Sequence, residues 1–140
     1  MPPSSKSPDT SVELLRAAQR AVSRAYCPYS GFPVGAAVLV ADGRIFDGCN
    51  VENASYGLAI CAERVALFNA VAAGARNVER LAVSCPNASP DQSANSMPCG
   101  ACRQVMAEFM SADAEVVVDG VGIFRLAALL PDAFQLQRRR

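Results

Sequence analysis

The residues best suited to chemistry in this sequence are three cysteines and a glutamate, which lie in two short motifs. Residues 61–64 (CAER) supply Cys61 and Glu63, and residues 98–103 (PCGACR) supply Cys99 and Cys102. Three thiolates can hold a zinc ion and leave its fourth coordination position open, which is typical of catalytic zinc sites. Glu63, two residues after the first cysteine, is then placed to move protons rather than to bind the metal. The two motifs therefore predict a zinc hydrolase that activates water.

Each motif is expected at the start of a helix, where unsatisfied N–H groups and the helix dipole favour a thiolate. Cys99 and Cys102 are three residues apart, so both lie on one helical face. Arg64 and Arg103 each follow a cysteine directly and could withdraw charge from sulfur as partners of the metal ligands. The spacing favours Arg64 for this role.

The cysteines also allow interpretations other than zinc binding. A lone CxxC is a weak signal, because cysteines are common in protein cores and a cytosolic CxxC can be a redox pair. The combination of CAE with PCGAC matches the zinc-deaminase signature and favours zinc over both. Cys27, Cys49 and Cys85 have no such partners and are interpreted as structural. A non-catalytic zinc module, in which the metal only holds the fold, stays open and would not need Glu63.

Composition narrows the possible functions further. The 140 residues suit a single domain, and 51% of them are hydrophobic. Thirteen basic residues balance 13 acidic ones, so net charge gives no argument for binding nucleic acid. The sequence has no histidine, which excludes the Ser-His-Asp triad, the Cys-His pair and the HExxH zinc site. A general base must come from Asp, Glu, Lys, Tyr or Cys.

The ends of the chain and its hydropathy predict a cytoplasmic protein. No signal peptide is visible, and no apolar run approaches the roughly 20 residues that a membrane span needs. In that compartment the six cysteines are expected to be free or metal-bound. We expect a disordered leader at residues 1–10, one catalytic domain at 11–134 and a flexible tail at 135–140, whose terminal arginines are solvated.

Hydrophobic periodicity and turn residues predict the elements that position these motifs. Thr10 and Glu13 are spaced as a capping box and predict a helix over 11–26. The pattern further predicts strands at 34–41, 44–47, 79–84, 115–118 and 121–126, helices at 60–73 and 98–110, and a helical turn at 127–130. Residues 85–97 are expected to form an exposed, mobile polar loop. The order predicts an α/β fold of three layers, α/β/α, with a mixed, mostly five-stranded sheet.

The two cysteine motifs resemble those of the small cytidine deaminases, the homotetrameric branch with three cysteine ligands. The resemblance extends to residues 28–37 (PYSGFPVGAA), 48–56 (GCNVENASY) and 129–134 (LLPDAF). It covers about residues 11–134. It implies a cytidine deaminase-like fold and hydrolytic deamination of cytidine and deoxycytidine to uridine and deoxyuridine with release of ammonia, a reaction of pyrimidine salvage.

The resemblance also assigns residues to the reaction centre. It implies that Cys61, Cys99 and Cys102 bind one zinc ion per subunit and that Glu63 shuttles protons. The backbone at Ala62 and around Pro98 is expected to meet the pyrimidine.

The resemblance implies further substrate contacts, some of them between subunits. Phe32 is expected to lie against the pyrimidine, and Asn50 and Glu52 to hydrogen-bond the ribose hydroxyls. On an extended segment, residues two apart point the same way, so this pair can grip one diol. Three further residues are expected to reach the active site of a neighbouring subunit: Ala54, Tyr56 and Phe134. The homotetramer would then be required for catalysis.

Other deaminases compete with this interpretation. The nearest alternative is deamination of another aminopyrimidine nucleoside, such as an antibiotic of the blasticidin type, although Asn50 and Glu52 favour an ordinary ribose. A polynucleotide-editing deaminase is disfavoured, because the chain has no basic excess and that class typically uses a histidine ligand. Deoxycytidylate is disfavoured because no phosphate-binding motif is evident.

Overall fold

A mixed five-stranded sheet forms the middle layer of the molecule. The structure is a computed structural model, and it describes residues 8–139. The strands lie in the order β2-β1-β3-β4-β5, and within the described residues the β3–β4 pair is parallel while the other neighbours are antiparallel. Their bounds are β1 (Gly35–Val40), β2 (Ile45–Cys49), β3 (Val78–Ser84), β4 (Glu115–Val118) and β5 (Gly122–Arg125). The predicted mixed sheet is confirmed.

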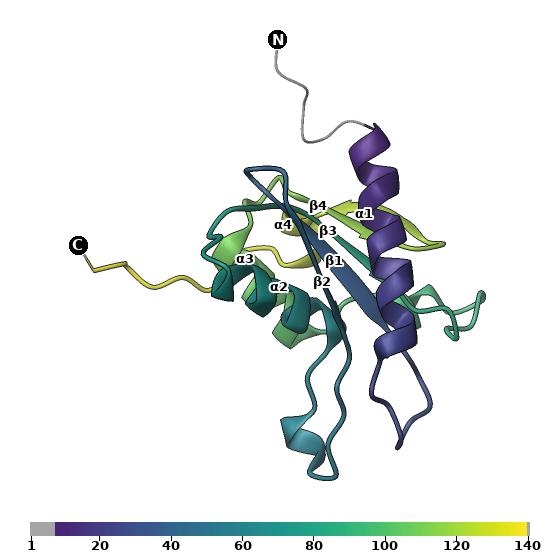
Figure 1. Cartoon of the computed structure of the whole chain (residues 1–140). Coiled ribbons are helices and arrows are strands. Elements are labelled where there is room, and N and C mark those ends of the chain that lie inside the picture. The colour runs from purple at the N-terminus through teal and green to yellow at the C-terminus, as the bar shows by residue number, and fades with distance from the viewer. Residues whose placement is uncertain (1–7, 140) are drawn as a thin grey trace.

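Helices cover both faces of this sheet, as Figure 1 shows. The helix α1 (Pro8–Ala21) lies on one face, and α2 (Ala62–Ala72) and α3 (Gly100–Phe109) lie on the other. Shorter helical segments complete the fold: η1 (Val22–Arg24), η2 (Tyr56–Leu58), η3 (Ser93–Ser96) and α4 (Leu126–Leu129). The three-layer α/β/α arrangement predicted from the sequence is therefore confirmed.

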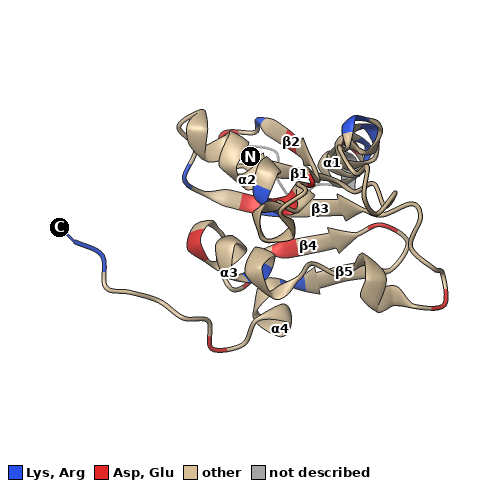
Figure 2. Ribbon diagram, turned by 90° about the horizontal axis from the view of Figure 1, so that it is seen from below, with Lys and Arg blue, Asp and Glu red and all other residues tan. Residues whose placement is uncertain are grey.

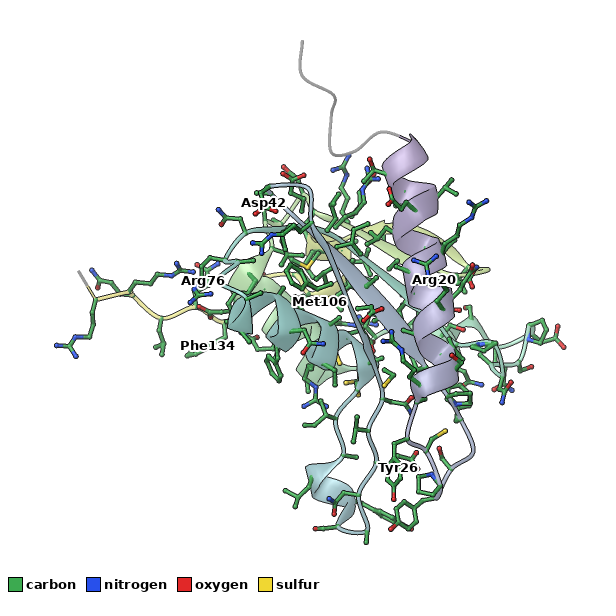
Figure 3. All side chains as sticks on the ribbon, in the orientation of Figure 1. Arg20, Tyr26, Asp42, Arg76, Met106 and Phe134 are labelled. Atoms are coloured by element: carbon green, nitrogen blue, oxygen red, sulfur yellow. The ribbon has the colours of Figure 1, made fainter. Side chains whose placement is uncertain are left out.

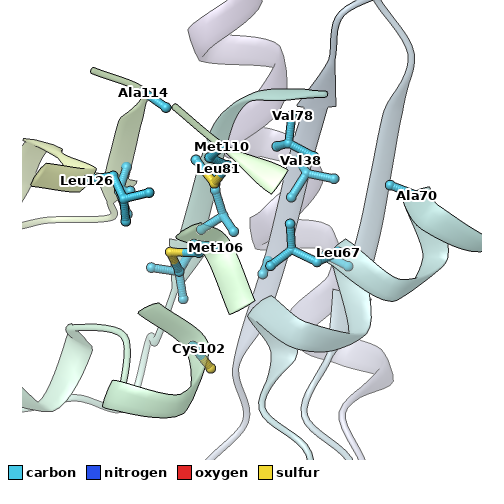
Figure 4. Close-up of a cluster of buried hydrophobic side chains, with 14 of the residues drawn as sticks. Val38, Leu67, Ala70, Val78, Leu81, Cys102, Met106, Met110, Ala114 and Leu126 are labelled. Carbon is cyan, nitrogen blue, oxygen red and sulfur yellow. The ribbon is translucent and has the colours of Figure 1, made fainter. Parts of the chain in front are cut away.

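The interior strand β1, which lies between β2 and β3, shows how the sequence produces two cores. All six of its residues are buried. Side chains alternate between the two faces of a strand, so Ala36 and Val38 join the core under α2 and α3, while Ala37 and Leu39 join the core under α1. Figure 4 shows the larger of these cores, which includes Val38. A strand that is hydrophobic without interruption is thus explained by burial on both sides.

The ends of α1 differ from the sequence prediction. The helix begins at Pro8, within the expected leader, because proline is well suited to the first helical position. Thr10 therefore lies inside the helix and is not its N-cap. Helix α1 ends at Ala21 and continues as the η1 turn, short of the expected residue 26, because the backbone N–H of Tyr26 donates to the Asn50 carbonyl at 2.9 Å. The rest of the predicted leader, residues 1–7, lies outside the described residues.

Charged residues of both signs are interspersed around the molecule in Figure 2, without one continuous basic stripe along the described part of the ribbon. This distribution agrees with the balanced composition of the chain. Between residues 8 and 139, no helix combines the length and the hydropathy needed to cross a membrane.

Gly48 in β2 sets how deeply α2 packs against the sheet. A Cβ atom built at Gly48 would lie 2.4 Å from the backbone nitrogen of Ala66 and 2.9 Å from the carbonyl oxygen of Ala62. Both distances are too short for any real side chain, so only glycine permits this approach. The same helix is held by Asn69, whose Nδ2 donates to the Asp47 carbonyl at 2.8 Å. Glu63 lies in the first turn of α2, so the close packing of α2 at Gly48 also determines how far Glu63 lies from the sheet.

Replacing Gly48 by alanine should therefore push α2 away from the sheet. We expect Gly48→Ala to lower the free energy of unfolding by about 1–3 kcal/mol, through overpacking. The corresponding fall in melting temperature, roughly 3–10 °C, is measurable by differential scanning calorimetry. Gly57→Ala is the matched control, since a Cβ there would meet no atom within 4 Å. Equal melting temperatures for the two variants would contradict this account of the packing.

Candidate metal centre

Three cysteine thiols converge where helices α2 and α3 begin. The Sγ atoms of Cys61 and Cys99 are 3.8 Å apart, and those of Cys99 and Cys102 are 3.5 Å apart. All three sulfur atoms lie within 4.8 Å of one another. Zinc–sulfur bonds of about 2.3 Å in tetrahedral geometry require sulfur atoms about 3.8 Å apart, so the cluster fits a zinc ion with three protein ligands.

Two helix starts bring these thiols together. Cys61 is the N-cap of α2 and Cys99 is the N-cap of α3; both have extended backbone conformations, and neither side chain forms a capping hydrogen bond. Their sulfur atoms can therefore turn toward the metal. Cys102 lies in the first turn of α3 and is fully buried. Figure 4 shows it in line with Met106 and Met110 along the helix, so the core itself fixes the third thiol.

The two arginines of the motifs have different partners. Arg64 places its Nη2 atom 3.5 Å from the Sγ of Cys61. Arg103 instead donates hydrogen bonds of 2.8 Å to two carbonyl oxygens, from Nε to Pro98 and from Nη1 to Leu129. Arg64 thus adds positive charge beside sulfur, whereas Arg103 ties the segment before Cys99 to the C-terminal part of the chain.

The electrostatics of the cluster favour a thiolate at Cys61. Hydrogen bonding from the Cys102 thiol, followed by that from Arg64, lowers the pKa of Cys61 to about 5. The pKa of Cys102 is raised, mainly by the same hydrogen bond to Cys61 and then by burial. A positive ion among the three sulfur atoms supplies the charge that a cluster of deprotonated thiols requires.

Glu63 lies in the first turn of α2, two residues beyond Cys61. Its side chain is only 5% exposed. Burial is the main reason that the pKa of Glu63 is raised to about 7, and the nearby Cys61 thiolate raises it further. A carboxyl group with a pKa near neutrality can both accept and donate a proton, which is the property required of a general acid–base group.

A cavity of about 240 Å3 opens in front of the thiols and of Glu63. Four of the residues predicted to contact substrate line it: Phe32, Asn50, Glu52 and Ala62. The structure therefore brings together residues from the 28–37 and 48–56 segments and from the CAER motif, although they are far apart in sequence.

Asn50 and Glu52 also hold the loop that carries Phe32. The Oδ1 atom of Asn50 accepts from the Val34 N–H at 2.8 Å, and its Nδ2 donates to the Phe32 carbonyl at 2.9 Å. The Oε1 atom of Glu52 accepts from the N–H groups of Tyr29 and Ser30 at 3.0 and 3.1 Å. The sequence predicted only that Asn50 and Glu52 hydrogen-bond the ribose hydroxyls. It did not predict these hydrogen bonds to the loop.

Three predicted substrate residues lie away from this cavity within the single chain. Ala54 is exposed, and Tyr56 is 79% exposed beside Tyr29, with the two rings edge to face and 6.2 Å apart. Phe134 is 68% exposed, and Figure 3 shows it on the C-terminal segment, well separated from Tyr26. Its carbonyl accepts a hydrogen bond from Gln104 of α3.

The sequence interpretation missed several residues of the cavity wall. The loop at 85–97, expected to be exposed and mobile, contributes Asn95, Ser96 and Met97, and Ser96 is buried. Their position directly before Pro98 and Cys99 could have indicated this. Cys85, interpreted as structural, also lines the cavity. Burial, followed by the charge of Glu63, raises its pKa to about 12, so it stays a neutral thiol.

Comparison with known proteins agrees with this geometry. Residues 8–119 match the family model described as "Cytidine and deoxycytidylate deaminase zinc-binding region". A cytidine deaminase from Sporosarcina psychrophila is 44% identical over 126 residues, covering 87% of this chain and 89% of that protein. One from Mycobacterium tuberculosis is 45% identical over 131 residues, covering 92% and 93%.

Solved structures give the same result. The crystal structure of cytidine deaminase from Burkholderia pseudomallei superposes with a TM-score of 0.79 at 49% identity, covering 88% of this chain and 98% of that one. Fold and site together define a zinc-dependent hydrolase with a three-cysteine metal centre. The chain belongs to the cytidine and deoxycytidylate deaminase family.

Removing one exposed thiol should empty the centre without unfolding the protein. We expect Cys99→Ala to lower bound zinc from about one ion per chain to well below half, because two thiolates hold zinc much less firmly than three. Cys99 is exposed, so little core packing is lost. Cys27→Ala, which removes a thiol outside the cluster, should retain zinc. Elemental analysis of both purified proteins is the measurement, and a full zinc content in Cys99→Ala would contradict the assigned ligand set.

Proposed function

We propose that this chain hydrolyses the 4-amino group of cytidine and deoxycytidine, giving uridine and deoxyuridine with release of ammonia. The observation that carries the proposal is the buried carboxyl group of Glu63, which lines one cavity together with Cys61 and Cys99 of the three-thiol cluster. The relatives reported above, which are named cytidine deaminases and align over most of the chain, support this choice of substrate.

In this proposal Cys61, Cys99 and Cys102 hold the zinc ion, and Arg64 offsets part of the negative charge on sulfur. Zinc, when bound, makes a water molecule available as a nucleophile near neutral pH. The fully buried Cys102 and the two helix N-caps give the site a rigid frame. The open side of the cluster faces the cavity, where the substrate would enter.

Glu63 would carry the protons of the reaction. Its carboxylate accepts a proton from the attacking water, as oxygen bonds to C4 of the pyrimidine, and then donates that proton to N3 of the ring. Glu63 then accepts the proton of the new hydroxyl group on C4 and donates it to the amino nitrogen, so that the C4–N bond breaks, ammonia leaves and the C4 carbonyl forms. Burial favours this role, because a carboxyl group with a pKa of about 7 exchanges protons in both directions at neutral pH.

The cavity walls would orient the nucleoside. Phe32 offers a half-buried aromatic face to the pyrimidine, and the backbone of Ala62 lies on the wall near Glu63. Glu52 accepts three hydrogen bonds from the protein, of about the four that a carboxylate can accept, so one position is left for a ribose hydroxyl. Asn50 likewise has one amide hydrogen and one oxygen lone pair left to bond a ribose hydroxyl.

Replacing Glu63 by glutamine tests the catalytic assignment. Glutamine keeps the shape of the side chain but cannot accept and return a proton, so kcat for cytidine should fall by about 10²–10⁴. Bound zinc and the melting temperature should change little. Glu13→Gln, an exposed carboxylate on α1, is the matched control and should retain full activity.

The outcome separates the competing functions. Undiminished turnover by Glu63→Gln would defeat this mechanism. A zinc-loaded wild-type chain that is inert toward cytidine would indicate another aminopyrimidine nucleoside, such as a blasticidin-type substrate, or the non-catalytic zinc module.

We propose further that the working unit is a homotetramer with shared active sites in the cytoplasm. Exposed hydrophobic side chains support an interface, since large exposed apolar surface often marks a protein–protein contact; they include Tyr26, Tyr29, Tyr56, Leu58, Phe68 and Phe134. Ala54, Tyr56 and Phe134 would then complete the site of a neighbouring subunit. All six cysteines are free, which suits the reducing cytoplasm.

Shared sites predict complementation between two inactive variants. Phe134→Ala should be impaired because it cannot complete its neighbour's site, and Glu63→Gln because it lacks the proton carrier. Co-expressed subunits should regain activity, because an intact Glu63 from one chain then meets an intact Phe134 from the other. Leu136→Ala, which alters a nearby exposed side chain, should be active by itself. Full activity of Phe134→Ala, or of a monomer defined by light scattering, would contradict the shared site.

A further inference from the structure

The loop that carries Phe32 is bound to the segment that carries Asn50 and Glu52. Three backbone hydrogen bonds join them: from Tyr26 N–H to the Asn50 carbonyl at 2.9 Å, from Glu52 N–H to the Tyr26 carbonyl at 2.8 Å, and from Asn50 N–H to the Val34 carbonyl at 3.2 Å. These bonds hold the two ends of the loop. Its tip, which includes Ser30, must be placed by other contacts.

One hydroxyl group at this tip connects both sides of the substrate cavity. The Oγ of Ser30 donates to the Oε2 of Glu52 at 2.5 Å and accepts from the N–H of Phe32 at 3.0 Å. Glu52 lies on the wall proposed to meet the ribose, and Phe32 on the wall proposed to meet the base. A single side chain therefore links the two groups that would hold the nucleoside.

We propose that Ser30 is a positioning residue for the deaminase reaction, acting through Glu52 and Phe32 without touching the substrate. The proposal rests on the proposed function, because it uses the substrate walls assigned there. The Ser30 side chain lines a recess next to the main cavity, together with Tyr29, Glu52 and Tyr56, and does not line the cavity that contains Glu63.

The consequences of losing this hydroxyl follow from its two hydrogen bonds. Without it, Oε2 of Glu52 has no partner in the described chain, and the carboxylate is held only through Oε1 by backbone N–H groups. The Phe32 N–H also loses its acceptor within the loop. The Ser30 hydroxyl is also the main cause of the lowered pKa of Glu52.

Ser30 should therefore affect substrate binding more than chemistry. Among the described residues, the hydrogen bonds of Ser30 reach neither the three thiols nor Glu63, which lie at the starts of α2 and α3. A ground-state effect of this kind raises KM and leaves kcat nearly unchanged.

Steady-state kinetics with three serine variants form the first test. Ser30→Ala should raise KM for cytidine about tenfold, as expected for loss of a hydrogen bond to a charged group, while kcat stays within about twofold. Ser30→Thr keeps the hydroxyl at an exposed position and should restore KM. Ser23→Ala is the matched control, because that exposed hydroxyl bonds only to the Arg20 carbonyl among the described residues.

A second readout does not depend on turnover. The sequence has no tryptophan, so Phe32→Trp places a single fluorescent reporter at the tip of the loop. Adding Ser30→Ala to this variant should increase quenching by acrylamide, since the loop is less firmly held, whereas adding Ser23→Ala should not.

The two readouts separate the possible failures. An unchanged KM in Ser30→Ala, failure of Ser30→Thr to rescue it, or unchanged quenching would overturn the role of Ser30. A wild-type chain that does not turn over cytidine would overturn the proposed function instead, and the quenching measurement would still decide whether Ser30 positions Phe32.

Discussion

The site depends on two helix N-termini that meet closely enough for three thiols to surround one ion. Deprotonated sulfur atoms 3.5–3.8 Å apart repel one another strongly unless positive charge lies among them. Zinc supplies that charge, and Arg64 and the two helix dipoles add to it. The remainder of the fold can be understood as the frame that holds α2 and α3 at this separation: α2 packs on β2 where Gly48 allows a close approach, and the core fixes Cys102 and Met106 of α3.

The same frame gives Glu63 its chemistry. Helix α2 begins at the metal centre, so the side chain two residues beyond Cys61 points into the protein and is almost wholly buried. Burial disfavours the ionised form of a carboxyl group, and the pKa of Glu63 rises accordingly. Around this centre the cavity is completed by polar side chains that also hold one another. Asn50 and Glu52 fasten the loop of Phe32, so the groups proposed to bind the nucleoside are ordered before it arrives.

Much of this arrangement could be predicted from the sequence, for identifiable physical reasons. Strand β1 is buried on both faces and carries no polar side chain, and β4 lies at the predicted residues, 115–118. Asp42 and Gly43 predicted the β1–β2 hairpin, where Gly43 adopts a positive φ of 94°. The metal cluster was predictable because the spacing of Cys99 and Cys102 on one helix already placed two ligands together.

What could not be predicted depends on contacts between distant segments. Helix α1 does not extend to residue 26, where the backbone N–H of Tyr26 bonds to the Asn50 carbonyl instead, and a local pattern does not reveal this contact. The wall formed by residues 95–97 arises because the loop folds back over the site before Pro98. The exposed Tyr56 and Phe134 have no role within one chain that its sequence or its fold makes evident, and only the family resemblance pointed to a neighbouring subunit.

The central claim is that the three-thiol centre and Glu63 together make a zinc-dependent cytidine deaminase. The most direct measurement follows the ultraviolet absorbance of cytidine as its 4-amino group is lost, using the purified protein as isolated, after removal of zinc by a chelator, and after zinc is restored. The account predicts turnover that disappears with the metal and returns with it. Undiminished turnover by a protein shown to be free of zinc, or no turnover by the fully zinc-loaded protein, would contradict it.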